Sequence, residues 1–400
     1  MINLEVPKKA GALINQAYQA AAEVFRPISR KYDRAEHTYP AELDMFAALL
    51  DGLNSSGEGG AGAAGVRRSA PDTAKGNRNG ANLNVVLGTI EMCWGDVGLL
   101  LSMPRQGLGN AAISSVATDE QLERFSGLWA AMAITEPDCG SDSAAITTTA
   151  VLDGDDYVLN GEKIFVTSGQ RADAVVVWAT LDRSKGRAAI KSFVVEKGTP
   201  GFEVVRVEHK LGIRASDTAV LRFENCRVPR ENLLGTPDID TAKGFAGVMQ
   251  TFDNTRPLVA AMAVGVARAA LEETRRILTS AGVTIDYDRP PQHPAAATWL
   301  ELEADFESAY LLTLQSAWMA DNRKPNSLQA SMAKAKAGRT VVDVTLKCVE
   351  LAGAYGYTEE SLLEKWARDA KILDIFEGTQ QIQQLIVARR ILGKSSAELK

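Results

Sequence analysis

The spacing of apolar residues divides the chain into a helical part, a strand-rich part and a second helical part. Apolar side chains recur every three or four positions within Leu13–Leu53 and again within Leu83–Leu101, which predicts amphipathic helices. Pro27 and Pro40 are expected to separate the first of these helices. Thr118, followed by two acidic residues, is typical of a helix start.

From about Ala131 the pattern becomes typical of strands, with short runs rich in β-branched residues. The pairs Asp153-Gly154 and Asn160-Gly161 separate the first runs and predict hairpin turns. The predicted strands are 147–151, 157–159, 164–166, 174–179, 192–196, 202–208 and 219–223.

Helical spacing returns after Gly244 and continues to the C-terminus. Leu258–Leu278 is apolar on nearly all sides until Glu272, which predicts a central helix of a bundle. Helices, strands and helices in this order predict an α+β fold with segregated layers. We expect an N-terminal α-helical domain at residues 1–130, a middle β domain at 131–236 and a C-terminal helical domain at 237–400.

Composition narrows the possible functions. The 400 residues carry a net charge of −6, which argues against binding to a nucleic-acid backbone, and no apolar run is long enough for a membrane span. Four separated cysteines and the absence of a leader-like N-terminus predict a reduced, cytoplasmic protein. The three histidines are far apart in sequence, so we expect no metal site. The glycine-rich stretch 54–80 predicts a long loop.

Glu377 is the strongest candidate for chemistry. Ile375 and Phe376 precede it, so its carboxylate should be poorly solvated, with a raised pKa and greater strength as a base. Gly378 follows and gives the backbone conformational freedom. The alternative is that this segment is only a turn that ends a helix.

Two further motifs lie in the strand-rich part. Pro137 and Gly140 predict a turn that presents the hydroxyls of Thr135 and Ser141, which suits a polar ring edge but also an ordinary β-turn. The segment 159–169 reads as a hairpin followed by a strand, with Phe165 either in the core or against a ligand.

Two segments contain possible ion pairs. Asp253 and Arg256 are three residues apart, so they share one face of what we expect to be the first turn of a buried helix. Such a pair is either structural or part of a binding site. In the segment 210–218 we expect a structural role, with Arg214 and Asp217 paired.

Together, these motifs closely resemble those of the acyl-CoA dehydrogenases, a family of FAD enzymes. The matches are Thr-Glu-Pro with Gly-Ser-Asp from Thr135, the 159–169 segment, the 251–257 segment and Glu-Gly-Thr at Glu377. They occur in order at appropriate separations, so the resemblance covers nearly the whole chain. It implies a helical N-terminal domain, a β-barrel-like middle domain and a C-terminal four-helix bundle.

The resemblance also implies roles for individual residues. Glu377 would be the catalytic base. Phe165 departs from the tryptophan that is usual in the family, although it can still pack on a flavin ring. The residues expected to bind FAD are Ile134, Thr135, Gly140, Ser141, Phe165, Thr167, Thr379 and Gln381. The residues expected to bind the acyl-CoA are Ser141, Asp253, Thr255, Arg256 and Gly378.

The implied reaction is α,β-dehydrogenation of an acyl-CoA thioester to a trans-2-enoyl-CoA, as in fatty-acid β-oxidation. An electron-transfer flavoprotein would then reoxidise the flavin. Two alternatives remain open. In the first, the chain is a structural or catalytically weak subunit of a heteromeric acyl-CoA dehydrogenase. In the second, it is a flavin oxidase or monooxygenase of the same fold, and oxygen reoxidises the flavin.

Two segments depart from the family. Members carry an arginine and a Phe-Gly pair that reach the FAD of a neighbouring subunit, whereas this chain has Asp286, Asp288 and Arg289 in that segment. Glu350 adds a negative charge where the family has glutamine and paired glycines. These departures suggest a heterotetramer with a paralogous subunit as an alternative to the homotetramer. The long loop at 54–80 could accompany a different acyl pocket.

Overall fold

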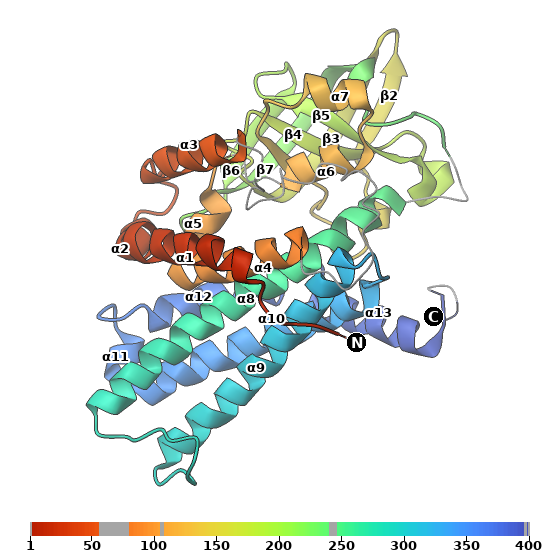
Figure 1. The fold of residues 1–400 in the computed structure, drawn as a ribbon. Helices are drawn as coiled ribbons and strands as arrows, with labels where there is room; N and C mark the ends of the chain where they lie inside the picture. The colour runs from red at the N-terminus through yellow and green to blue at the C-terminus, as the bar shows by residue number, and fades with distance from the viewer. Residues whose placement is uncertain (1, 56–79, 105–107, 240–245, 396–397, 399–400) are drawn as a thin grey trace.

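The computed structural model describes residues 2–55, 80–104, 108–239, 246–395 and 398, except for the side chains of residues 9, 49–55 and 246–254. A curved sheet forms one end of the molecule, and long helices form the other (Figure 1). Most of the predicted loop at 54–80 lies outside the described residues. Only its two ends are described: residues 54 and 55, which belong to a helix that ends at Ser55, and Gly80.

The N-terminal part is helical, as the apolar spacing predicts. Its α-helices are α1 (Gly11–Ala20), α2 (Arg26–Arg34), α3 (Glu42–Ser55), α4 (Ala81–Gly95), α5 (Val97–Ser102), α6 (Leu108–Val116) and α7 (Asp119–Arg124). Pro27 does not separate helices, because a π-helical turn, Ala21–Phe25, joins α1 to α2 without a break, and Pro27 lies at the start of α2. Thr118 begins α7 with a capping box, since its hydroxyl accepts from the Gln121 N–H and the Gln121 side chain accepts from the Thr118 N–H.

The middle part is a seven-stranded sheet. Its strands are β1 (Ala130–Ala133), β2 (Thr149–Asp153), β3 (Asp156–Thr167), β4 (Ala174–Thr180), β5 (Ile190–Glu196), β6 (Phe202–Val207) and β7 (Thr218–Pro229). The strand order is β1-β4-β2-β3-β7-β6, and β5 pairs with β4. β1 packs parallel to β4, which the sequence pattern did not predict.

The two predicted hairpins have different outcomes. Gly154 does lie in the turn between β2 and β3, and its φ is 64°. The hairpin at Asn160-Gly161 is wrong, because β3 continues through both residues as one strand with a register shift against β7. A side chain at Gly161 would overlap Thr148, so the glycine serves close packing and not a turn.

The C-terminal part is a bundle of long helices. They are α8 (Ala246–Ser280), α9 (Pro294–Asp321), α10 (Ser327–Ala352), α11 (Ala354–Tyr357), α12 (Leu363–Leu373) and α13 (Gln380–Leu392). The predicted central helix is confirmed, because α8 packs on α4, α9, α10 and α12, and its residues from Val259 to Leu271 are mostly buried. None of the described helices is long and apolar enough to cross a membrane.

A buried ionic network joins the N-terminal helices to α12. The Lys365 Nζ lies 2.7 Å from the Asp96 Oδ2 and 2.5 Å from the Asp369 Oδ2, and all three side chains are buried. Desolvation alone would lower the pKa of Lys365, but the carboxylates of Asp369 and Asp96 raise it overall, so the lysine stays charged. Ser29 of α2 donates to the same Asp96, and Asp369 accepts from the Ile213 N–H at 2.5 Å.

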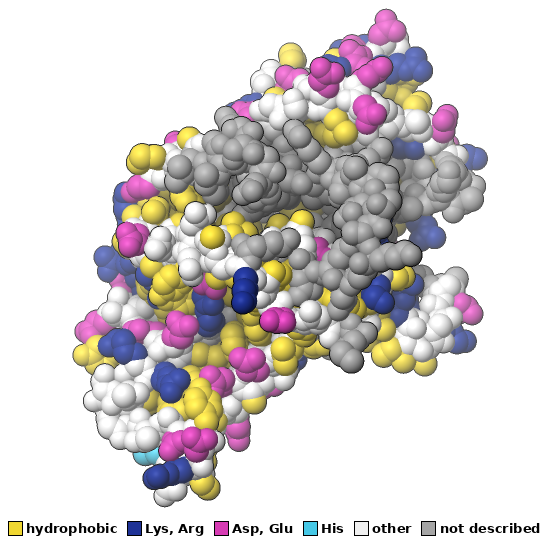
Figure 2. Space-filling view, viewed as in Figure 1, with side chains coloured by type: hydrophobic (Ala, Val, Ile, Leu, Met, Phe, Trp, Pro, Cys, Tyr) yellow, Lys and Arg dark blue, Asp and Glu magenta, His cyan; other side chains and the backbone are white. Residues whose placement is uncertain are grey.

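Acidic and basic side chains are interspersed on the surface. Figure 2 shows both signs over the sheet end of the molecule. On the sheet, Arg227 of β7 lies 2.8 Å from Asp153 of β2 and 3.1 Å from Asp156 of β3. Such exposed pairs contribute little to stability.

Candidate active site

Glu377 lies in the turn between α12 and α13, and its backbone is in the left-handed region. Its φ is 55°, which is uncommon for a residue other than glycine, and Gly378 follows with a φ of 93°. A side chain at Gly378 would also overlap the Gln383 amide. Gly378 is therefore required both by its backbone conformation and by the space available.

Three side chains hold this turn in place. The Lys334 Nζ donates to the Gly378 carbonyl oxygen at 2.7 Å, and the Gln383 Nε2 donates to the same oxygen at 3.2 Å and to the Glu377 carbonyl oxygen at 3.3 Å. The Thr379 hydroxyl caps α13 by accepting from the Ile382 N–H at 3.4 Å. Thr379, expected to bind FAD, thus also has a structural role.

The Glu377 carboxylate is in an environment suited to a base. Burial raises its pKa, whereas the Thr255 hydroxyl, which donates to its Oε2 at 2.9 Å, and the charges of Lys334 and Arg256 lower it, and the net result is a raised pKa. The predicted direction is confirmed. The expected cause is incomplete, because Ile375 is 44% exposed, and α10 approaches the end of α12 closely at Gly338.

Lys334 is the functional candidate that the sequence analysis missed. It is fully buried on α10, and desolvation lowers its pKa to about 8, although the charges of Asp374 and Glu377 oppose that shift. The sequence does contain a signal for it: Lys334 is a charged residue at helical spacing from Ala330, Ala333 and Ala337, which form a buried face of α10. A buried lysine without a sequence-adjacent acid indicates a partner elsewhere in the fold.

Arg256 and Thr255 reach this group from α8. Arg256 is buried, and its charge acts on both Glu377 and Lys334. α8 begins at Ala246, so the expectation that Arg256 lies on the first turn is wrong. The Asp253 side chain, expected to bind acyl-CoA, lies outside the described residues.

A second group of candidates lies on the sheet and centres on Glu136. Its carboxylate accepts from the N–H groups and hydroxyls of Thr147 and Thr148, at 2.5 to 2.9 Å, and the buried Lys163 Nζ lies 2.8 Å from its Oε1. Burial alone would raise the pKa of Glu136, but the Lys163 charge and the hydrogen bonds lower it to about 2. Glu136 therefore stays ionised and holds the loop after β1 against β3.

These bonds bring the predicted flavin residues together. The Lys163 Nζ donates to the Ile134 carbonyl oxygen at 3.1 Å, and the Ile164 N–H donates to the Thr135 carbonyl oxygen at 2.8 Å. Ile134 and Thr135 are consequently fixed beside the part of β3 that carries Phe165 and Thr167. Gly140 and Ser141 are exposed on the same loop.

Phe165 provides the test of whether this surface suits a flavin. It is 62% exposed at a φ of 57°, whereas Tyr157, Phe193 and Phe223 of the same sheet are buried. An exposed aromatic ring in a left-handed backbone, on the strand that also carries Thr167, fits one face of an isoalloxazine. The alternative of a core Phe165 is wrong. α6 links the sheet to the helices that surround Glu377, because it packs on both β1 and α8.

Other predicted residues have different surroundings. Gln381 is exposed at the start of α13. The predicted pair of Arg214 and Asp217 is wrong, because the Asp217 Oδ1 lies 2.6 Å from the Arg171 Nε and the Arg214 Nε donates to the Lys210 carbonyl oxygen. The fold brings Arg171 to Asp217, although 46 residues separate the two in sequence.

Comparison with known proteins agrees with this geometry. Residues 131–226 match the acyl-CoA dehydrogenase middle domain, and residues 242–392 match the acyl-CoA dehydrogenase C-terminal domain. The chain is 39% identical over 305 residues to a short-chain specific acyl-CoA dehydrogenase of Clostridium acetobutylicum, covering 74% of this chain and 78% of that protein. It is 33% identical to an NADH-dependent acryloyl-CoA reductase of Anaerotignum propionicum, covering 94% and 93%.

A solved structure gives the same answer for the fold. Butyryl-CoA dehydrogenase from Megasphaera elsdenii superposes with a TM-score of 0.82 at 28% identity, covering 98% of this chain and 100% of that one. The fold and site define an FAD-dependent oxidoreductase. The chain belongs to the acyl-CoA dehydrogenase family.

Proposed function

We propose that this chain dehydrogenates a short-chain acyl-CoA, with Glu377 as the base that removes the α-proton. The observation that carries the proposal is the Glu377 carboxylate itself, which is desolvated, has a raised pKa and accepts a hydrogen bond from Thr255. Its backbone is left-handed, and Lys334 and Gln383 donate to the carbonyl oxygens of this turn. A base of this kind holds a proton more strongly than a glutamate in water. The product would be a trans-2-enoyl-CoA.

The remaining residues would position the thioester and the cofactor. An enolate oxygen forms as the α-proton leaves, and the Glu377 backbone N–H is proposed to donate to it. FAD, when bound, would supply the acceptor for the hydride of the β-carbon. Arg256, Thr255 and Gly378 would contact the substrate, together with Asp253. Ile134, Thr135, Gly140, Ser141, Phe165 and Thr167 would line the flavin, and Thr379 and Gln381 would contact its adenylate half.

The short-chain preference rests on the relatives. The Clostridium acetobutylicum protein is named as short-chain specific, and the Megasphaera elsdenii structure is of a butyryl-CoA dehydrogenase. The acryloyl-CoA reductase, which aligns with 94% of the chain, favours the reverse reaction as a second candidate function. In that direction the same Glu377 would return a proton to the α-carbon. The two functions differ in whether NADH supports turnover with an enoyl-CoA.

The alternative of a catalytically weak subunit is less well supported. A structural subunit has no need for a desolvated carboxylate in a strained backbone, and Glu377 has both features. We keep the homotetramer and the heterotetramer as competing proposals. Arg289, the substitute considered for the missing arginine, is exposed and lies 3.8 Å from Asp286. Glu350 lies 2.6 Å from Lys347.

The electron-transfer flavoprotein, β-oxidation and the cytoplasmic location stay predictions. Three exposed apolar residues of α13, Leu385, Ile391 and Leu392, support association with another subunit. Figure 1 shows α13 extending away from the body of the bundle.

A flavin oxidase would differ from a dehydrogenase by producing peroxide under air.

The absorbance spectrum of the chain purified alone tests the proposal. We expect about one flavin per chain, and bleaching of its visible absorbance when butyryl-CoA is added without oxygen. A flavin-loaded protein that no acyl-CoA bleaches would contradict the proposed function. Protein without flavin would favour the heterotetramer, and co-expression with a paralogous subunit should then restore the flavin.

A further inference from the structure

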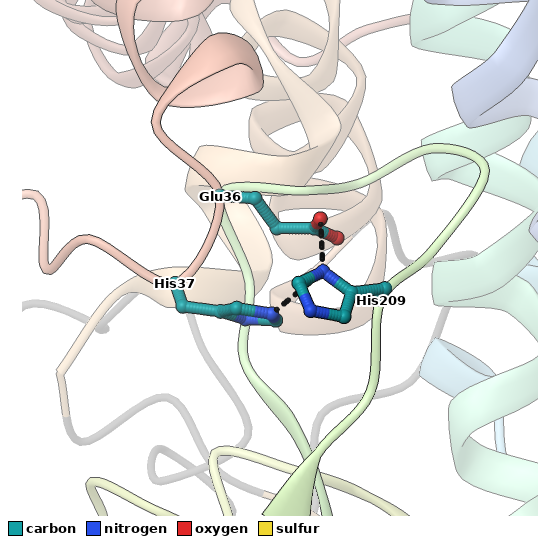
Figure 3. A group of neighbouring side chains, drawn as sticks. All are labelled: Glu36, His37 and His209. Carbon is teal, nitrogen blue, oxygen red and sulfur yellow. Dashed lines mark hydrogen bonds and ion pairs between the residues drawn. The ribbon is translucent and has the colours of Figure 1, made fainter.

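Three side chains suited to metal binding meet between the N-terminal helices and the sheet. Glu36 and His37 lie just after α2, and His209 lies just after β6, so the two segments are 172 residues apart in sequence. Figure 3 shows the three side chains directed toward one another, and their ligand atoms all lie within 4.8 Å. The chain contains only three histidines, and the expectation that they are isolated is wrong for two of them.

The spacing of these atoms suits a small tetrahedral ion. The His209 Nδ1 lies 2.9 Å from the Glu36 Oε2 and 3.3 Å from the His37 Nε2. In a tetrahedral Zn²⁺ site with bonds of about 2.0–2.1 Å, neighbouring ligand atoms lie about 3.3–3.4 Å apart. All three ligand atoms lie within 4.8 Å of one another, so the widest separation must shorten toward this value when an ion binds.

The surroundings hold the ligands in this arrangement. The Glu36 Oε1 accepts from the Lys210 N–H at 2.8 Å, which orients the carboxylate and fixes the loop that carries His209. His37 has a φ of 69° and lies in a turn closed by the Thr38 N–H and the Ala35 carbonyl oxygen at 3.0 Å. Histidine is one of the residues that adopt this conformation more readily. Such outer contacts are typical of sites that keep ligands oriented.

The hydrogen-bond pattern leaves a lone pair for a metal. The His209 Nδ1 faces both the Glu36 carboxylate and the His37 Nε2, and a neutral imidazole carries one hydrogen, on one of its two nitrogens. In the tautomer with that hydrogen on Nε2, the His209 Nδ1 presents its lone pair to this point. A cation here makes three direct bonds to nitrogen and oxygen.

We propose that Glu36, His37 and His209 form a Zn²⁺ site that links the N-terminal helices to the sheet. Two imidazoles and one carboxylate are a ligand set that zinc accepts, with the fourth position left to water. The His209 side chain is 82% exposed, so the ion has a direct path from solvent. The site shares no residue with the Glu377 group, and its role is to fasten the two parts of the chain.

Zinc binding by the tag-free holoenzyme tests this proposal. Metal is first removed with a chelator, and Zn²⁺ is then titrated in competition with a chromogenic chelator. We expect about one Zn²⁺ per chain and a rise in Tm of about 2–5 °C at saturation. Co²⁺ at the same site should give the visible bands of tetrahedral coordination. The four cysteines are buried, so they do not compete for added metal.

Two variants and a control distinguish this site from adventitious binding. His209→Ala should lose the bound equivalent and the rise in Tm, and Glu36→Gln should weaken both. His293→Ala removes the third histidine, which caps α9, and should bind zinc as the wild type does. The proposal is overturned if wild-type protein binds no stoichiometric Zn²⁺ or if His209→Ala binds it equally well. Glu36, His37 and His209 would then be only a hydrogen-bonded surface group.

Discussion

Glu136 is buried and Glu377 is partly buried, and their pKa values move in opposite directions. Glu136 accepts four hydrogen bonds from Thr147 and Thr148 and has the ammonium of Lys163 at 2.8 Å, so its pKa falls to about 2. Glu377 accepts one hydroxyl hydrogen bond from Thr255, and burial raises its pKa. The difference lies in how far the protein replaces the lost hydration.

This comparison separates a structural carboxylate from a reactive one. A carboxylate whose lone pairs are all satisfied binds a proton weakly, and removing it leaves its partners without compensation. A carboxylate with few donors keeps its affinity for a proton, which a base requires. Burial alone does not distinguish the two roles.

The largest effect is expected from Glu377→Gln. The amide keeps the size of the side chain but cannot accept the α-proton, so the rate of acyl-CoA dehydrogenation should fall by about 10²–10⁴. Flavin content and Tm should change little. Anaerobic flavin reduction by butyryl-CoA measures the rate, with Glu301→Gln on the exposed side of α9 as the control. Unchanged reduction in Glu377→Gln would exclude Glu377 as the base.

Glu136→Gln should instead lower stability. The substitution leaves the buried Lys163 without a counter-charge, and breaking such a pair costs about 3–5 kcal/mol of unfolding free energy. Glu162→Gln is the matched control, because Glu162 pairs with Arg222 only at the surface, at 3.8 Å. Denaturant unfolding followed by circular dichroism measures both.

The same pair has a pH signature. The pKa of Glu136 is depressed from 4.5 to about 2, so its contribution to stability is present above 4.5 and is lost as the pH falls toward 2. Glu136→Gln should flatten this part of the stability curve. If wild type and Glu136→Gln lost stability equally over this range, the depressed pKa would be excluded.

A smaller effect is expected from Lys334→Met. The substitution removes the donor to the Gly378 carbonyl oxygen and a positive charge that lowers the pKa of Glu377. We expect kcat to fall by about 10- to 100-fold, because the base loses its fixed position, while flavin content is retained. The acid limb of the activity profile should also move to higher pH. Lys336→Met, which removes only a surface pair with Asp305, is the control.

The smallest effect is expected from Thr255→Val, which keeps the shape of the side chain and removes the hydrogen bond to Glu377. That hydrogen bond lowers the pKa of Glu377, so its loss should raise the pKa further. Because the base acts in its ionised form, kcat/KM should fall more at low pH than at high pH. A shift to lower pH would contradict this account of the carboxylate.

The local patterns of the sequence predicted much of the fold. Periodicity located the long helices, and Thr118 and Gly154 marked a helix start and a turn as expected. Continuity of β3 through Asn160-Gly161 was not predictable from local turn preference, because pairing with β7 decides it. Local preference is weakest where tertiary pairing competes with it.

The site was less predictable, because its contacts are distant in sequence. The direction of the Glu377 pKa followed from apolar neighbours, but Lys334 is 43 residues away from it, and its role depends on how α10 meets the turn. The pairing of Asp217 with Arg171 and the approach of His37 to His209 have the same origin. Sequence proximity favoured Arg214 and isolated histidines, and both expectations were wrong.

The buried Lys365 between Asp96 and Asp369 has a consequence for any attempt to shorten the protein. A fragment that begins at the sheet would retain Lys365 and Asp369 but lose Asp96 and the Ser29 hydroxyl, which exposes half of an ion cluster that the intact chain excludes from water. We therefore expect that such a fragment does not fold without the missing N-terminal helices. For the same reason we expect α2, α5 and α12, which this network joins, to unfold together, although the sheet separates them in the sequence.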